Sequence, residues 1–120
     1  MPPLDDQARL RHMLDAAQAA QRFLAGRTQE DLHTDLQLQM AVAHCVQIIG
    51  EAAARLSEQT QADIPELPWR DIRAMRNQIV HVYFDLDTAV LWKTVCDDLP
   101  PLIDAVGRSF PVEGDDPRQA

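Results

Sequence analysis

Four side chains that could act together on a phosphate lie within one short segment of this sequence: Arg76, Asn77, His81 and Tyr83. The guanidinium group of arginine binds phosphate through two hydrogen bonds and stays charged at any working pH. Histidine is the side chain whose ordinary pKa lets it exchange protons near neutrality. Residues 76–83 are therefore the candidate site for chemistry on a phosphate.

The spacing of apolar residues predicts that this segment belongs to one helix, from about Pro68 to Tyr83. At about 100° per residue, one face of that helix carries only apolar side chains and is the predicted core face. The core face consists of Ile72, Met75, Ile79, Val82 and Leu86. The opposite face mixes apolar and polar side chains, which is typical of a cleft or an interface with a partner. This second face consists of Trp69, Arg73, Arg76, Asn77, Val80, His81 and Phe84.

The second face leads us to expect a homodimer. Arg76 and His81 are about 140° apart on an ideal helix, so one helix alone does not aim both at one phosphate. A two-fold dimer packed through the Trp69–Phe84 face would bring two arginines and two histidines into one groove. The alternative is a helix buried on two sides within a monomeric bundle.

The rest of the pattern predicts an all-α fold, an up-and-down bundle of four to five helices that forms a single domain over residues 1–110. The first helix spans residues 4–25 and ends at Gly26. Thr28 has the hydroxyl of a helix cap, and we expect one long helix over residues 28–58.

Proline and aspartate mark the later boundaries. Two prolines place a loop or a short helical turn within residues 59–68. After the helix of the candidate site, Asp87 can cap a fourth helix that ends near Asp98, and a short last helix reaches about Phe110. Residues 111–120 are expected to form a disordered acidic tail.

The charge of the chain is acidic overall but uneven. A net charge of −8 argues against a protein that coats nucleic acid with a broad basic surface. Residues 69–83 nevertheless hold Arg70, Arg73 and Arg76 against Asp71, a small basic island suited to brief phosphate contact. No stretch has the composition of a membrane span or a secretory signal, so we expect a cytoplasmic protein.

The remaining histidines and cysteines do not have the spacing of metal ligands. His33 and His44 lie about 16 Å apart along one predicted helix, and His12 belongs to another. Cys45 and Cys96 fall in apolar segments and are expected to be free, buried thiols. No metal ion and no other cofactor is expected.

Gly50 is a second notable feature, because glycine inside a helix costs about 1 kcal/mol relative to alanine. We expect it to permit close contact between two helices. Glu51 beside it could then be partly buried, with Arg55, Arg73 or Arg76 as its cation. The alternative is a solvated glutamate.

The order Arg76-x4-His81-x-Tyr83 resembles the R-x4-H-x-Y signature of HepT-like proteins, a branch of the HEPN superfamily of helical domains. The resemblance covers about residues 5–105. It includes Ile49–Ala53, Ile64 and Pro65, Trp69, Met75–Asn77, His81–Phe84, Asp87–Trp92 and Asp98–Leu102. One departure is Val82, where many relatives carry a polar residue, commonly aspartate.

This resemblance implies a metal-independent endoribonuclease toxin of a type II toxin–antitoxin system. Such proteins act as homodimers in which the R-x4-H motifs meet at the interface, so Arg76 and His81 are the implied catalytic residues. Their usual partner is a minimal nucleotidyltransferase (MNT-type) antitoxin. That enzyme can neutralise the toxin by adenylylating the tyrosine of the motif, here Tyr83.

The residue types agree with this chemistry. RNA can be cleaved without a metal when the ribose 2′-OH attacks phosphorus, if protons are transferred and the added negative charge is stabilised. His81 can act as acid or base, and Arg76 can hold the phosphoryl oxygens. Asn77 and Arg73 can support the contact with RNA. Glu51 could in turn hold an arginine in position without touching the RNA itself. An adenylate on Tyr83 would block the groove by its bulk and charge.

Two other functions fit the sequence. The first is a non-catalytic HEPN module that docks a nucleotidyltransferase, although docking alone needs neither Arg76 nor His81. The second is a helical bundle with an unrelated role. Tyr83 could likewise be an ordinary tyrosine at the edge of the core.

Overall fold

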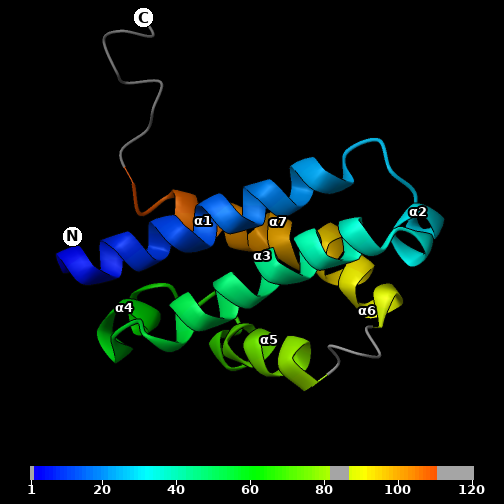
Figure 1. The fold of residues 1–120 in the computed structure, drawn as a ribbon. Helices are drawn as coiled ribbons and strands as arrows, with labels where there is room; N and C mark the ends of the chain where they lie inside the picture. The colour runs from blue at the N-terminus through cyan, green and yellow to red at the C-terminus, as the bar shows by residue number, and fades with distance from the viewer. Residues whose placement is uncertain (1, 82–86, 111–120) are drawn as a thin grey trace, which may run out of the picture.

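The computed structural model describes residues 2–81 and 87–110, with the side chains of residues 2–76 and 87–110. Every regular element in this part of the chain is a helix (Figure 1). In order they are α1 (Leu4–Leu24), α2 (Gln29–Thr34), α3 (Leu36–Ala54), α4 (Glu58–Asp63), α5 (Trp69–His81), α6 (Thr88–Lys93), the π-helix η1 (Thr94–Asp98) and α7 (Leu99–Gly107). The all-α prediction is confirmed, with more helices in the described residues than the four to five expected.

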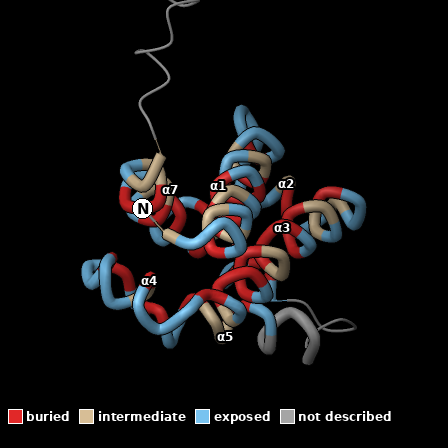
Figure 2. The backbone as a smooth tube through the Cα atoms, turned by 90° about the vertical axis from the view of Figure 1, so that its left-hand side faces the viewer, coloured by how far each residue is buried: buried red, intermediate tan, exposed pale blue. Residues whose placement is uncertain are grey.

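Helix α3 is the centre of the arrangement. It lies between α1 on one side and α5 on the other, and α7 packs along α1 (Figure 1). The buried sides of α1, α3 and α7 face one another in the end-on view (Figure 2). The largest fully buried side chains are Leu10, Met13, Leu32, Val42, Ile49, Leu99, Leu102 and Val106.

The boundary between α2 and α3 is not the one predicted. Gly26, at φ +74°, ends the turn after α1, and Thr28 caps α2, both as predicted. The single helix over residues 28–58 is wrong, because Asp35 leaves the helical conformation at φ −106° and ψ 101°. Its carboxylate instead accepts a hydrogen bond of 3.1 Å from the backbone N–H of Leu38 and caps α3. Aspartate gives the backbone this alternative to a continuous helix.

The C-terminal helices follow one another without a loop. Asp87 caps α6 as predicted, accepting hydrogen bonds of 3.1 Å from two backbone N–H groups. The chain then runs through η1 into α7, whose first turn holds Pro100 and Pro101. Proline has no N–H to offer an α-helical hydrogen bond, and its ring clashes with the carbonyl four residues earlier. The wider π turn before the prolines accommodates both effects.

A buried aspartate, Asp6, ties the start of α1 to the connection between α3 and α4. Its carboxylate accepts hydrogen bonds from Ser57 N (3.2 Å), Ser57 Oγ (2.5 Å) and Thr60 Oγ1 (2.7 Å). Burial opposes ionisation of this carboxyl. The hydrogen bonds from Ser57 and Thr60, together with the charge of Arg9, outweigh burial and hold the pKa of Asp6 below its ordinary value. Ionised Asp6 therefore stabilises the fold.

Close contact between α3 and α5 depends on Gly50. A β-carbon added at Gly50 would clash with the backbone nitrogen of Arg76 and lie 2.9 Å from the Cβ of Arg76. The expectation that Gly50 permits a close helix contact is confirmed. Its neighbour across the contact is the arginine of the candidate site.

We expect Asp6→Asn to lower the free energy of unfolding by about 1–3 kcal/mol at neutral pH, because hydrogen bonds to a buried charge are lost. A folded-state pKa below the unfolded one gives stability above the unfolded pKa that is lost as pH falls through the folded pKa. The gap between wild type and variant should therefore narrow below about pH 4. Urea denaturation at several pH values measures it. Asp15→Asn, an exposed α1 carboxylate 4.0 Å from Arg11, is the matched control and should change little. A gap independent of pH would contradict the role of the charge.

We expect Gly50→Ala to lower the free energy of unfolding by about 1–3 kcal/mol, because the added methyl group meets the backbone of α5 and not a flexible side chain. Gly107→Ala is the control, since a β-carbon there has no neighbour within 4 Å. That variant should be as stable as the wild type or more stable. Denaturant titration of both variants checks the pair. A Gly50→Ala protein of unchanged stability would mean that α5 moves away at no cost.

Candidate functional site

Arg76 projects an exposed side chain from a backbone held at a fixed place. Its main chain rests against Gly50, so the position of Arg76 is set by the packing of α5 on α3. Within the described residues its guanidinium forms no ion pair. Arg76 therefore has a fixed backbone and a positively charged side chain that can donate hydrogen bonds to a phosphate.

His81 is the last residue of α5. The helix is continuous from Trp69 to His81, so Arg76 and His81 stand on one helix with about 140° between them, as predicted. The side chains of Asn77 and His81 lie outside the described residues, as does the whole of Tyr83.

The core face of α5 agrees with the prediction where it is described. Ile72 and Met75 are buried against the rest of the bundle. The side chain of Ile79 and residues 82–86, which include Val82 and Leu86, lie outside the described part.

Trp69 does not belong to the second face of α5, contrary to the prediction. It is only 9% exposed, and its indole Nε1 donates a hydrogen bond of 2.9 Å to the backbone carbonyl of Ile64. The chain arriving from α4, with Ile64 and Leu67 buried, covers this first turn of α5. Trp69 therefore belongs to the core, and the solvent-facing part of α5 begins after it.

Arg73 connects α5 to α4. Its side chain is half-buried, and Nη1 donates a hydrogen bond to Oε1 of Gln61. Part of this guanidinium is thus occupied in holding α4 against α5.

Glu51 does not have the buried environment that was expected. It is exposed, and Oε1 accepts a hydrogen bond of 3.4 Å from Nε2 of Gln47. No arginine forms an ion pair with it within the described residues. Since Gly50 faces α5, the next residue points about 100° away from that contact and into solvent. The solvated alternative is correct.

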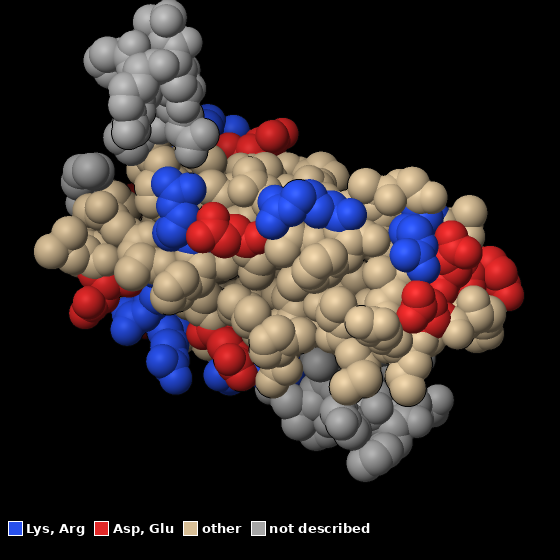
Figure 3. Space-filling view, turned by 45° about the horizontal axis from the view of Figure 1, so that its top comes forward, with Lys and Arg blue, Asp and Glu red and all other residues tan. Residues whose placement is uncertain are grey.

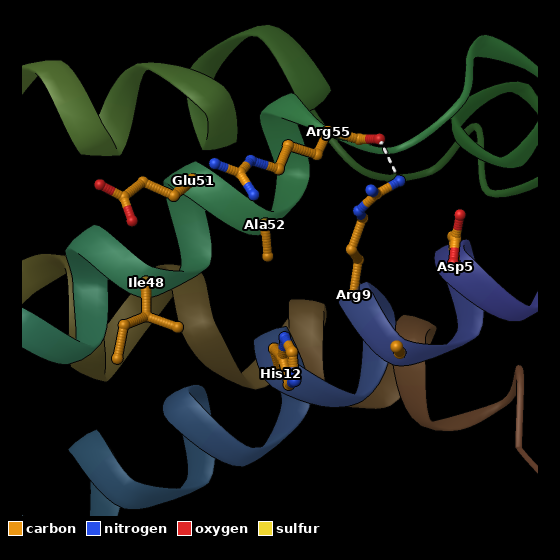
Figure 4. Close-up of a pocket in the computed structure, with 8 residues that line it drawn as sticks. Asp5, Arg9, His12, Ile48, Glu51, Ala52 and Arg55 are labelled. Carbon is orange, nitrogen blue, oxygen red and sulfur yellow. Dashed lines mark hydrogen bonds between the residues drawn. The ribbon is translucent and has the colours of Figure 1, made fainter.

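A groove of about 290 Å³ between α1 and α3 is a feature that the sequence analysis missed. Its lining residues are Asp5, Ala8, Arg9, His12, Ile48, Glu51, Ala52 and Arg55 (Figure 4). Arg9 Nη1 crosses the groove end to donate a hydrogen bond of 2.9 Å to the backbone carbonyl of Arg55. The two halves of the lining are some forty residues apart in sequence, so no local motif signals it.

The surface and the thiols complete the description. Basic and acidic side chains interleave on the face shown in Figure 3. Cys45 is buried, which raises the pKa of its thiol, whereas Cys96 is exposed, contrary to expectation.

Among the described residues, no three histidine, cysteine or carboxylate side chains gather as a metal site. None of the helices described is both long and apolar enough to span a membrane.

Comparison with known proteins gives a consistent result. Residues 13–108 match the family Ribonuclease HepT-like. A relative from Thermococcus cleftensis, named Probable ribonuclease HepT, is 37% identical over 93 residues, 78% of this chain and 84% of that protein. A protein of Methanocaldococcus jannaschii provisionally named an RNase is 28% identical over 102 residues, 85% of this chain and 94% of that protein. A third, from Caldanaerobacter subterraneus and also provisionally named an RNase, is 29% identical over 93 residues, 78% of this chain and 83% of that protein. No solved structure shows a significant match. The family match spans most of the chain and includes the whole Arg76–Tyr83 segment, so this chain belongs to the HepT-like ribonuclease family.

Proposed function

We propose that this protein is a metal-independent endoribonuclease that acts as the toxin of a type II toxin–antitoxin pair. The observation that carries the proposal is the placement of Arg76. Its backbone is fixed against Gly50, its side chain is exposed, and His81 follows five residues later on the same continuous helix. Membership of a ribonuclease family supplies RNA as the substrate class.

The proposed reaction uses the RNA's own 2′-OH. One imidazole of His81 takes the proton from this hydroxyl as its oxygen bonds to phosphorus. A second imidazole gives a proton to the 5′-oxygen as the bond from phosphorus to that oxygen breaks. The products are a 2′,3′-cyclic phosphate and a free 5′-hydroxyl. The guanidinium of Arg76 stabilises the negative charge that grows on the phosphoryl oxygens.

A homodimer supplies the second imidazole in this proposal. The contact would use α5 after Trp69, which removes the tryptophan from the interface first expected. Leu36 and Met40, 66% and 52% exposed, lie on one face of α3, the helix against which α5 packs, and offer apolar area for such a contact. Such an interface should bury on the order of 1,600 Å².

Sedimentation at micromolar concentration should show a dimer, and a monomer alone would exclude the shared site.

Control by a minimal nucleotidyltransferase antitoxin is the second part of the proposal. The acceptor would be the phenolic oxygen of Tyr83, the only tyrosine of the chain. Adenylate there would add bulk and negative charge seven residues after Arg76.

The alternative function is a non-catalytic module that docks the nucleotidyltransferase. The interleaved charges of Figure 3 and the net charge of −8 favour it, because neither resembles a long RNA-binding surface. Cleavage by the purified chain separates the two functions.

We expect His81→Ala and Arg76→Ala each to reduce RNA cleavage by roughly 10²–10⁴-fold while the fold is kept, through loss of proton transfer and of charge stabilisation respectively. Arg22→Ala, an exposed arginine on α1, is the control and should cleave normally. Gel analysis of a labelled RNA, with and without EDTA, is the measurement. Activity lost in EDTA and restored by magnesium would contradict metal independence. A folded, fully active His81→Ala protein would contradict the mechanism.

We expect Tyr83→Phe to remain an active ribonuclease that escapes control, because it lacks the acceptor oxygen but keeps the ring. Intact-mass analysis after incubation with the cognate transferase, ATP and magnesium measures the modification. Wild type should gain the mass of one adenylate per modified chain and lose activity, and Tyr83→Phe should do neither. If wild type is silenced without a mass increase, the antitoxin acts by binding alone.

A further inference from the structure

We propose that the groove between α1 and α3 binds one nucleotide of the RNA that flanks the cleaved bond, with its phosphate on Arg9 and Arg55. This inference rests on the proposed ribonuclease function and adds a second contact site to it. The ligand chemistry is a nucleotide phosphate, and the source to which we commit is the RNA strand.

The two arginines are arranged differently, and both arrangements suit a phosphate. Arg9 is held in place, since Nη1 donates 2.9 Å to the carbonyl of Arg55 and lies 3.7 Å from Oδ1 of Asp6. Its remaining N–H groups are therefore oriented before a ligand arrives, which lowers the entropy cost of binding. Arg55 contributes a side chain that is exposed and forms no ion pair within the described residues.

The groove separates its charges along its length. Figure 4 shows Asp5 and Glu51 at opposite ends, with Arg9, Arg55 and His12 between them. An anion in the middle thus meets two guanidinium groups and an imidazole, while the carboxylates stand at the ends. The carboxylate of Glu51 could accept a hydrogen bond from an amino group of a base.

The size and the walls of the groove also fit a single nucleotide. Its volume of about 290 Å³ is at the small end of ligand sites. Ala8, Ile48 and Ala52 give it an apolar wall, against which a base or ribose can lie. A nucleotide presents this same combination of a flat apolar ring and an anionic phosphate.

The groove lies next to the contact that positions the candidate site. Glu51, at its end, directly follows Gly50, whose backbone meets that of Arg76. The groove and α5 are therefore separated by the width of α3, about 10 Å. A strand of a few nucleotides spans this distance, so one RNA can occupy both sites.

Part of the groove lies outside the span of the family match. Arg9 and His12 precede residue 13, where the match to the ribonuclease family begins.

The test uses Arg55→Gln, which removes the guanidinium but keeps the backbone carbonyl that Arg9 binds, so its thermal stability should equal that of wild type. Binding is measured by fluorescence anisotropy in the inactive His81→Ala background. The probes are a long oligoribonucleotide and a dinucleotide too short to reach both sites. Arg22→Gln, which makes the same change in charge on α1 and outside the groove, is the control.

We expect Arg55→Gln to weaken binding of the long RNA about tenfold. Binding of the dinucleotide should fall less, because this probe occupies one site at a time and can still bind at α5. The slope of log affinity against log salt should fall by about one counterion, which a purely structural role would not produce. Arg22→Gln should match the parent protein in both measurements. Equal binding of the long RNA by Arg55→Gln and Arg22→Gln would overturn the groove.

Two further outcomes assign failure to its cause. Arg55→Gln could weaken the binding of 5′-AMP and leave the binding of long RNA unchanged. In that case the ligand of the groove is a free nucleotide, and the RNA proposal is wrong. If the unmodified protein neither binds nor cleaves any RNA, the proposed ribonuclease function fails, and the groove proposal fails with it. Normal cleavage with no effect of Arg55→Gln defeats the groove alone.

Discussion

The contact between the backbones of Gly50 and Arg76 is the constraint on which the candidate site depends. It sets how closely α5 approaches α3, and hence where the exposed guanidinium begins. Because main-chain atoms make the contact on both sides, the position of Arg76 does not depend on its own side chain. Fold and chemistry are thereby separable at this residue, and a chain that lost the arginine would keep the helix in place.

Helix α3 can serve as a common reference because both of its neighbours are also joined through the short helix α4. On one side, Asp6 of α1 accepts hydrogen bonds from Ser57 and Thr60. On the other, Arg73 of α5 donates to Gln61. A helix of six residues thus connects the element that carries the motif with an element that lines the groove, and polar side chains make both connections.

Features encoded by neighbouring residues could be predicted, and features that depend on distant contacts could not. Gly26, Thr28 and Asp87 act within one turn of their own position, so their boundaries are correct. Asp35 interrupts an otherwise helical pattern, because its carboxylate caps α3 and so competes with a continuous helix. The spacing of apolar residues contains no sign of this interruption. Trp69 was placed by its angle on α5, but a segment from α4 covers it.

The candidate site follows the same division. Its residue types and its single helix were readable from the sequence, and so was the close contact at Gly50. The groove was not, because α1 and α3 contribute its lining from separate parts of the chain. The solvent-facing direction of Glu51 follows only once the partner of Gly50 is known to be α5.

The π-helical turn over Thr94–Asp98 has a consequence for how the length of this chain can change. A π turn holds one residue more within its hydrogen-bonded ring than an α turn does. In a homologous chain without prolines at the start of α7, deletion of one residue there would convert the turn to ordinary α-helix. The buried face of α7, which carries Leu102 and Val106, would then not rotate away from α1. Homologous chains that differ by one residue between α6 and α7 can therefore share one core, and an alignment gap belongs at this turn.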